Sequence, residues 1–295
     1  MGPRSLAELG LDVVPALSPL SYPGRPVTRP ALLVDDLLVP LRARPGPLGD
    51  WPAADRNAWS LDAALAALGA DPAGRRHPVL AVGSNASPAQ LAHKLAGRGL
   101  PVVVPMVPVR VRGIGVGCSA HVGRNGYAPA APYADPAAEH TLVAAWFDAA
   151  QLAAVDATEP AYRRVPVTGP RFTMALPSGA PLPAAGLYVS RYGTLADPAT
   201  GRPRPGGGNQ RALLTALLAS PRLAALLGPG PEAWIARARA DAAARAEGAR
   251  IYLREGWVCC PGPGFWGDDP NPAAGCVRCP RTAEGPRCEP SAALR

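Results

Sequence analysis

The stretches Val79-Leu-Ala-Val-Gly-Ser-Asn85 and Leu152-Ala-Ala-Val-Asp-Ala-Thr-Glu-Pro-Ala-Tyr-Arg-Arg-Val165 decide how this chain is expected to fold. The first is a short apolar run, typical of a buried strand, that leads into the turn Gly83-Ser84-Asn85. Glycine permits backbone conformations closed to other residues, and successive N–H groups in such a turn can converge on an anion or a carbonyl oxygen. The second stretch places Glu159 between a short helix and a strand. We therefore expect one anion-binding loop and one catalytic carboxylate.

Short β-rich runs alternate with two short helices through the central region. Ser87-Pro88 opens the first helix, with serine as the N-cap and proline in the first turn, and the second helix covers about 149–157. Strands are expected at 79–82, 102–116, 142–147, 162–167, 172–176 and 185–188. Many short strands with few helices are typical of a small mixed β-barrel, so the expected class is α+β.

The two ends of the chain differ in composition from this centre. An apolar stretch at 31–41 and an amphipathic helix at 60–68 are expected to pack on the core. After Gly206-Gly207-Gly208, helices are expected at 210–218, 221–227 and 231–246, which would cap the barrel or make a homodimer contact. The expected divisions are an N-terminal extension (1–76), a barrel domain (77–192), a helical appendage (193–255) and a tail rich in Cys, Pro and Gly (256–295).

The combination resembles the γ-glutamylcyclotransferase-like superfamily over roughly residues 77–192. That family carries a YGSN loop after its first strand, and a glutamate in an LDxxEG-type segment followed by a YxRxxV-type strand. Here the two segments are VGSN and VDATEPAYRRV. The resemblance extends to Tyr127-Ala-Pro-Ala130 and Leu142-Val-Ala-Ala-Trp-Phe147, which stand where the family has strands. Val82 replaces the loop tyrosine, and Pro160 replaces the glycine after the glutamate, so the sequence does not specify the substrate.

The resemblance implies a barrel enzyme that acts on a small molecule bearing a γ-glutamyl group and needs no metal or organic cofactor. Glu159 would move a proton from the α-ammonium of the substrate to the leaving amine, with 5-oxoproline as the other product. The substrate-binding residues it implies are Val82, Gly83, Ser84, Asn85, Tyr162 and Arg163.

Two other residues, Asp156 and His121, compete for these roles, and the role of Arg163 has alternatives of its own. Asp156 is an alternative carboxylate, but it matches the structural Leu-Asp pair of the family. His121 lies close in sequence to a serine and a thiol, in a stretch without a nucleophile motif. Strand alternation puts Arg163 on the inward face with Val165 and Val167, where it would pair with an acid or face the pocket unless it lies beyond the edge of the core. Glu159 itself follows a helix end, where negative charge is unfavourable and no lysine is near in sequence.

Charge and hydropathy limit the partners. The formal charge is +8, but the arginines are scattered among 38 prolines and 32 glycines, and Lys94 is the only lysine. Because no aromatic residues interleave a basic stripe, we expect no nucleic-acid partner. No apolar run approaches the ~20 residues of a membrane span, and the first residues lack the apolar stretch of a secretory signal. We expect a cytoplasmic protein with a small-molecule substrate and no membrane partner.

A cysteine cluster near the end of the sequence is the second candidate functional site. Its members are Cys259, Cys260, Cys276, Cys279 and Cys288. Cys276-Val-Arg-Cys279 is a knuckle of the zinc-binding type, but the adjacent pair upstream is a poor match to a second knuckle. Free thiols, zinc ligation and disulfides all remain open, and we do not expect a resident metal. Two rival functions follow: a binding or regulatory module that kept the fold without the chemistry, and a zinc-stabilised interaction protein that acts through this tail.

Overall fold

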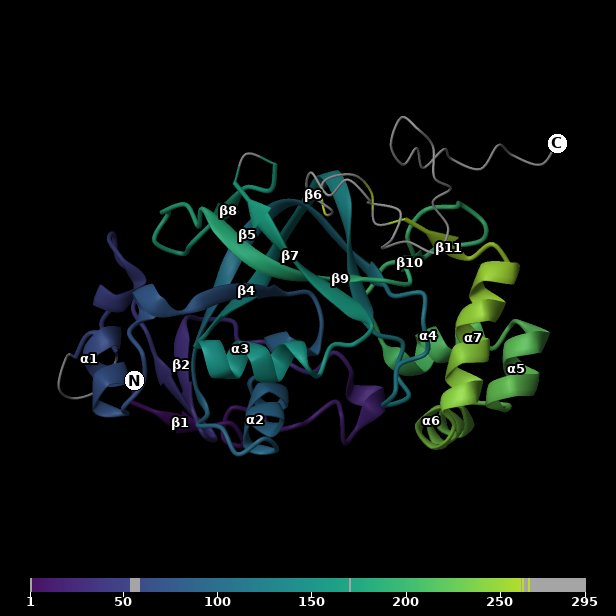
Figure 1. The fold of residues 1–295 in the computed structure, drawn as a ribbon, viewed down its shortest axis with the longest axis horizontal. Helices are drawn as coiled ribbons and strands as arrows, with labels where there is room; N and C mark the ends of the chain where they lie inside the picture. The colour runs from purple at the N-terminus through teal and green to yellow at the C-terminus, as the bar shows by residue number, and fades with distance from the viewer. Residues whose placement is uncertain (1, 54–58, 170, 261, 263–264, 266–295) are drawn as a thin grey trace.

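The computed structural model describes residues 2–53, 59–169, 171–260, 262 and 265. A nine-stranded sheet runs through it (Figure 1). Its strands are β1 (Arg4–Ser5), β2 (Ala31–Val34), β3 (Leu37–Pro40), β4 (His77–Ala81), β5 (Val103–Cys118), β6 (Ala130–Phe147), β7 (Tyr162–Thr168), β8 (Met174–Ala175) and β9 (Ala184–Ser190). Their order is β1-β3-β2-β5-β6-β4-β9-β7, with β8 pairing with β5. The strands β10 (Thr194–Leu195) and β11 (Val258–Cys259) form a separate two-stranded sheet.

A long antiparallel pair, β5 with β6, forms the centre of the sheet. Its register runs from Met106 opposite Ala145 to Cys118 opposite Ala130, with a shift after Arg112. Gly113, at that shift, has a φ of 87°, a conformation that glycine adopts without a steric cost. The expected strand at 142–147 is only the last part of β6, which begins at Ala130. Tyr127 to Pro129, expected to be strand by resemblance, precede it.

The expectation of a closed barrel is wrong. The side of β5 away from β6 pairs with β2, where Leu33 lies opposite Val104, and farther along with β8, where Val111 lies opposite Met174. Because the apolar stretch at 31–41 forms the β2–β3 hairpin, the sheet extends outward to β1 at this edge. At the other edge β7 pairs with β9, and β1 and β7 do not pair with each other in the described residues. The class is therefore mixed α and β with a large open sheet.

Seven helices accompany the sheet in the described residues. They are α1 (Leu61–Ala67), α2 (Pro88–Ala96), α3 (Ala149–Asp156), α4 (Gln210–Leu217), α5 (Pro221–Leu227), α6 (Pro231–Ala240) and α7 (Ala242–Arg254). The helix expected at 231–246 is in fact two helices, because Asp241 breaks it and caps α7 by accepting from the N–H groups of Ala243 and Ala244. Figure 1 shows α5, α6 and α7 grouped beside β10 and β11, with α1 at the opposite end of the molecule.

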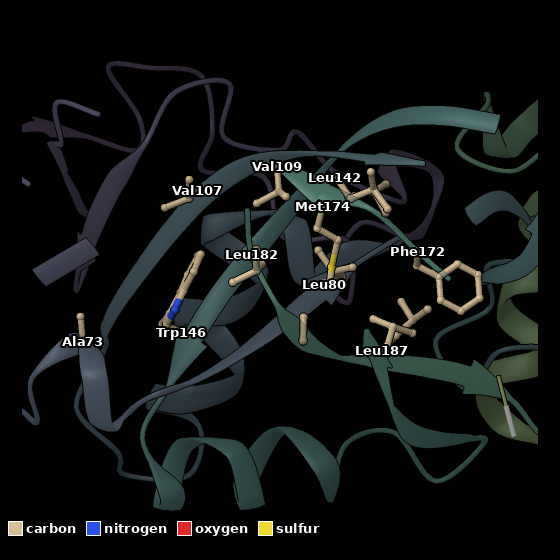
Figure 2. Packing of buried hydrophobic residues seen from close by; sticks show 14 of the residues in the cluster. Ala73, Leu80, Val107, Val109, Leu142, Trp146, Phe172, Met174, Leu182 and Leu187 are labelled. Atoms are coloured by element: carbon tan, nitrogen blue, oxygen red, sulfur yellow. The ribbon is translucent and has the colours of Figure 1, made fainter. Parts of the chain in front are cut away.

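Buried side chains pack in three clusters. Alternation along the strands sends neighbours to opposite sides, so that Leu80 joins one cluster and Val79 another. The Leu80 cluster includes Val107, Val109, Leu142, Trp146, Phe172, Met174, Leu182 and Leu187 (Figure 2). The Val79 cluster joins Val104 and Met106 to side chains of α2 and α3, including Leu91, Leu95 and Val155. The third cluster centres on Trp234 and Tyr252 of α6 and α7, with Cys118 and Val122.

None of the helices in the described part of the chain combines the length and the apolar character needed to cross a membrane.

Candidate functional site

The loop after β4 has the strand–turn–helix order expected from the sequence. After Val82 and Gly83, a 3-10 turn covers Ser84–Ala86, and α2 begins at Pro88 with Ser87 as N-cap accepting from Gln90 N–H. The backbone N–H groups of Gly83, Ser84 and Asn85 donate to no acceptor in the described residues. Three unused donors in one turn are what an anion-binding loop requires.

Gly83 is required here for a reason other than the expected one. Its φ is −131°, so the backbone conformation does not itself demand glycine. An added Cβ would instead overlap the Tyr22 hydroxyl. That hydroxyl accepts a hydrogen bond from Ala130 N–H at 2.7 Å, and the Tyr22 ring stacks on Tyr127 with centroids 4.1 Å apart. Tyr22 is therefore a fixed neighbour, and the absence of a side chain at Gly83 lets it approach the loop.

Glu159 lies just beyond α3 and reaches the loop. Its Oε1 accepts from Asn85 Nδ2 at 3.1 Å and from Lys94 Nζ at 2.6 Å, and Lys94 also donates to Asn85 Oδ1 at 2.7 Å. Only 13% of the Lys94 side chain and 17% of the Glu159 side chain are exposed. Among the described residues no donor reaches Oε2. One carboxylate oxygen is thus fixed by protein groups, while the other is open to a ligand.

No lysine lies near Glu159 in the sequence, but the fold supplies one, so the expectation that Glu159 has no compensating lysine is wrong. Lys94 belongs to α2, 65 residues earlier, and folding brings it to the carboxylate. Lys94 was missed, as were Tyr22 and Tyr127. The one signal that pointed to Lys94 was its standing as the sole lysine in a chain whose other basic residues are arginine.

A cavity of about 960 Å³ lies beside this group and draws its walls from distant parts of the chain. The N-terminal region contributes Ala16 and Tyr22, the loop contributes 80–85, and the segment after α3 contributes 158–162. The helices α6 and α7 contribute Arg239 and Arg245. Lys and Arg side chains in the wall are Lys94, Arg98, Arg124, Arg239 and Arg245, whereas Glu159 is the one acidic residue among the lining residues. Such a lining favours an anionic occupant.

The expected binding residues divide into two groups. Val82, Gly83, Ser84, Asn85 and Tyr162 line the cavity. Tyr162 donates its hydroxyl to Ala130 O at 2.8 Å, and burial raises its pKa well above the ordinary value. Arg163 is exposed and is not among the lining residues, although Val165 and Val167 of the same strand are buried as expected.

Asp156 serves a different purpose from Glu159. Its two oxygens accept from Arg164 at 2.9 and 3.0 Å, and Tyr188 Oη donates to it at 2.6 Å. Burial acts to raise the pKa of Asp156, but the hydrogen bonds from Arg164 and Tyr188 outweigh it, so that the pKa lies below its ordinary value. Asp156 therefore connects α3 to β7 and β9 and does not line the cavity.

The cysteine tail lies largely beyond the described residues, and Cys276, Cys279 and Cys288 fall outside them. Cys259 donates from Sγ to Thr194 O at 3.4 Å, and Cys260 is disulfide-bonded. Within the described ranges no three His, Cys, Asp or Glu residues group as metal ligands would. Zinc binding by the tail stays a hypothesis.

Comparisons with known proteins give structural neighbours only. No family model matches the chain, and no curated protein does. Among solved structures, a solution structure of an Arabidopsis thaliana protein is 20% identical with a TM-score of 0.30, covering 41% of this chain and 64% of its own. An uncharacterized protein from Homo sapiens is 15% identical with a TM-score of 0.30, covering 39% and 67%. The chain is also similar to a gamma-glutamyl cyclotransferase, at 16% identity and a TM-score of 0.29. The match covers 39% of this chain and 66% of that protein.

Proposed function

We propose that the cavity is the active site of an enzyme that releases 5-oxoproline from a small γ-glutamyl amine or peptide, with Glu159 as its single general acid and base. The observation that carries the proposal is the state of the Glu159 carboxylate at the cavity wall. Oε1 is fixed by Lys94 and Asn85, and Oε2 receives no hydrogen bond from the described residues. A carboxylate oxygen held in place and open to a ligand suits proton transfer.

The charges around the cavity match the two ends of a γ-glutamyl group. The group carries an α-carboxylate, which suits a wall rich in arginine, and an α-ammonium, which suits Glu159. The free N–H donors of Gly83, Ser84 and Asn85 suit the γ-carbonyl oxygen. A well-aimed donor of this kind contributes about 3 kcal/mol to an oxyanion.

The chemistry then needs one residue. Glu159 takes a proton from the α-ammonium, and the freed amine attacks the γ-carbonyl carbon to form the five-membered ring. The amide C–N bond breaks as Glu159 returns that proton to the departing amine, and the ring nitrogen gives up its second proton to solvent, which leaves a neutral lactam nitrogen in 5-oxoproline. Both reacting groups belong to one molecule, so orientation in the cavity supplies much of the rate enhancement.

A binding module is the second candidate, and the Lys94 contact favours it. Lys94 Nζ lies 2.6 Å from Oε1, so this oxygen is already engaged in an ion pair within the protein. The same cationic cavity would then hold a γ-glutamyl compound or another small anion without turnover.

The test is a screen of γ-glutamyl dipeptides and γ-glutamyl amines for 5-oxoproline release, with wild type beside Glu159→Gln. Release by the wild type alone supports the enzyme. Saturable binding by both proteins without release supports the module. If the wild type neither releases 5-oxoproline nor binds these compounds, both candidates are refuted.

A further inference from the structure

A second polar group, separate from Glu159, is built into the cavity wall around His121. The Nδ1 atom of His121 lies 2.6 Å from Ser119 Oγ, and Ser119 Oγ lies 2.6 Å from Ser190 Oγ. Ser190 Oγ in turn accepts from Tyr192 N–H at 3.1 Å. Ser119 has no exposed surface and Ser190 has 2%. The sequence hinted at a serine–histidine pair, but the buried Ser119 cannot be reached by a substrate and is therefore not a nucleophile.

The hydrogen-bond partners around Ser119 favour one tautomer of the ring. Ser190 already accepts from Tyr192 N–H, and the hydroxyl proton of Ser190 has Ser119 Oγ as its hydrogen-bond partner among the described residues. Ser119, accepting from Ser190, then has its own proton available for His121 Nδ1, while the Tyr162 hydroxyl, also beside Ser119, donates to Ala130 O. An imidazole that accepts at Nδ1 carries its proton at Nε2.

The surroundings of the ring keep it neutral and in place. His121 stacks on Tyr192 with centroids 5.0 Å apart and meets the edge of Tyr162 at 5.8 Å. Burial lowers the pKa of His121 to about 4, because the charged imidazolium would lose its hydration. Within the described residues Nε2 has no hydrogen-bond partner, yet it is not among the fully buried unpaired polar atoms. Since His121 lines the cavity, Nε2 is open to its contents.

We propose that His121 is a neutral hydrogen-bond donor of the cavity, held by Ser119 and Ser190, whose Nε2–H binds an oxygen of the occupant's carboxylate or acyl group. The inference rests on the proposed function for the identity of that occupant. The inference adds His121 as a positioning residue, and His121 lies outside the motifs that carry the family resemblance. A donor without a charge can bind an oxygen at any pH at which the ring stays neutral.

The state of the ring can be measured without any substrate. In ¹⁵N-labelled protein at about pH 7, long-range ¹H–¹⁵N spectra distinguish a protonated from an unprotonated ring nitrogen, and His121→Gln assigns the signals among the four histidines. We expect Nε2 protonated and Nδ1 unprotonated, with the ring still neutral at about pH 5. A protonated Nδ1, or an imidazolium in this range, would overturn the inference.

The role in binding is tested with γ-glutamylglycine as the probe. Titration into labelled protein should move the Nε2–H signal of His121 and leave that of His140, an exposed residue of β6, unmoved. His121→Leu should weaken binding, or raise KM, about 10-fold or more with kcat changed less, and His121→Gln should recover part of the loss. His140→Gln is the matched control. Thermal midpoints identify variants that are misfolded.

The outcomes separate the two proposals. A wild type that binds the probe through His121 but releases no 5-oxoproline would refute the enzyme and keep this inference. An unmoved His121 signal, or unchanged binding in a folded His121→Leu protein, would refute the inference whether or not the protein is active.

Discussion

Lys94 and Glu159 form an ion pair, with Nζ 2.6 Å from Oε1, although they lie 65 residues apart in the sequence. Both side chains are mostly enclosed, so the pair is screened less than a surface pair would be. Because the pair uses Oε1, the Oε2 oxygen of Glu159 stays open to a ligand. The pair therefore ties α2 to the segment after α3 and sets the orientation of the Glu159 carboxylate.

Glu159→Gln should lower kcat by at least ~100-fold on a substrate that the wild type turns over, because the amide keeps the shape but cannot carry a proton. The amide oxygen still accepts from Lys94 and Asn85, so the protein should stay folded, with a thermal midpoint lowered no more than that of Lys94→Met. Steady-state kinetics and thermal unfolding check the two statements. An active Glu159→Gln protein would leave the binding module as the better account.

Lys94→Met should leave the Glu159 carboxylate without its ammonium partner in a mostly enclosed site. We expect a loss of about 1–2 kcal/mol in the free energy of unfolding, between the values for exposed and buried pairs. Urea titration measures it, with the exposed Arg222→Met of α5 as the control for removal of one positive charge. Lys94→Met combined with Glu159→Gln should lose less than the sum of the two. Strict additivity would show that the ion pair does not contribute.

Gly83→Ala should lower the free energy of unfolding by about 1–3 kcal/mol and reduce activity, because the new Cβ overlaps the Tyr22 hydroxyl. Ser87→Ala, which removes only the cap of α2, should cost about 1 kcal/mol or less and keep activity. Adding Tyr22→Phe removes the overlapping atom, so the double variant should be more stable than the sum of the single losses predicts. A Gly83→Ala protein as stable and as active as wild type would contradict the role assigned to this loop.

Asp156→Asn should lose stability in a pH-dependent way. The pKa of Asp156 in the folded protein lies below the ordinary value of 3.8, so its contribution is complete above that value and is lost as the pH falls through the folded pKa. The difference in thermal midpoint from wild type should therefore be largest near pH 7 and shrink below about pH 4. Turnover at neutral pH should be largely kept. A difference that is constant with pH would contradict this interpretation.

The local parts of the site could be predicted from the sequence because neighbouring residues encode them. An apolar run, a glycine and a Ser-Pro helix start specify the strand, turn and helix around Gly83 and Ser87. The sequence likewise predicted that Glu159 lies between a short helix, observed at 149–156, and a strand that begins at Tyr162.

The contacts between distant segments could not be predicted in this way. Nothing near Glu159 in sequence indicates Lys94, and nothing near Gly83 indicates Tyr22. The closed barrel was wrong for the same reason, since the apolar stretch at 31–41 predicts a strand but not that it pairs with β5. The break at Asp241 was missed because the surrounding alanines and arginines favour helix on both sides.

Arg239 joins the two ends of the chain at the cavity, since its guanidinium donates both to Ala16 O, 223 positions away, and to Asn125 O. A fragment cut to the limits of the recognisable motif region, about 77–192, would keep Glu159 and Lys94 but lose Tyr22, Arg239 and Arg245. Such a fragment would present the Glu159 carboxylate on an open surface in contact with bulk water. Its inactivity would say nothing about the chemistry of Glu159, so every assay described above calls for the intact chain.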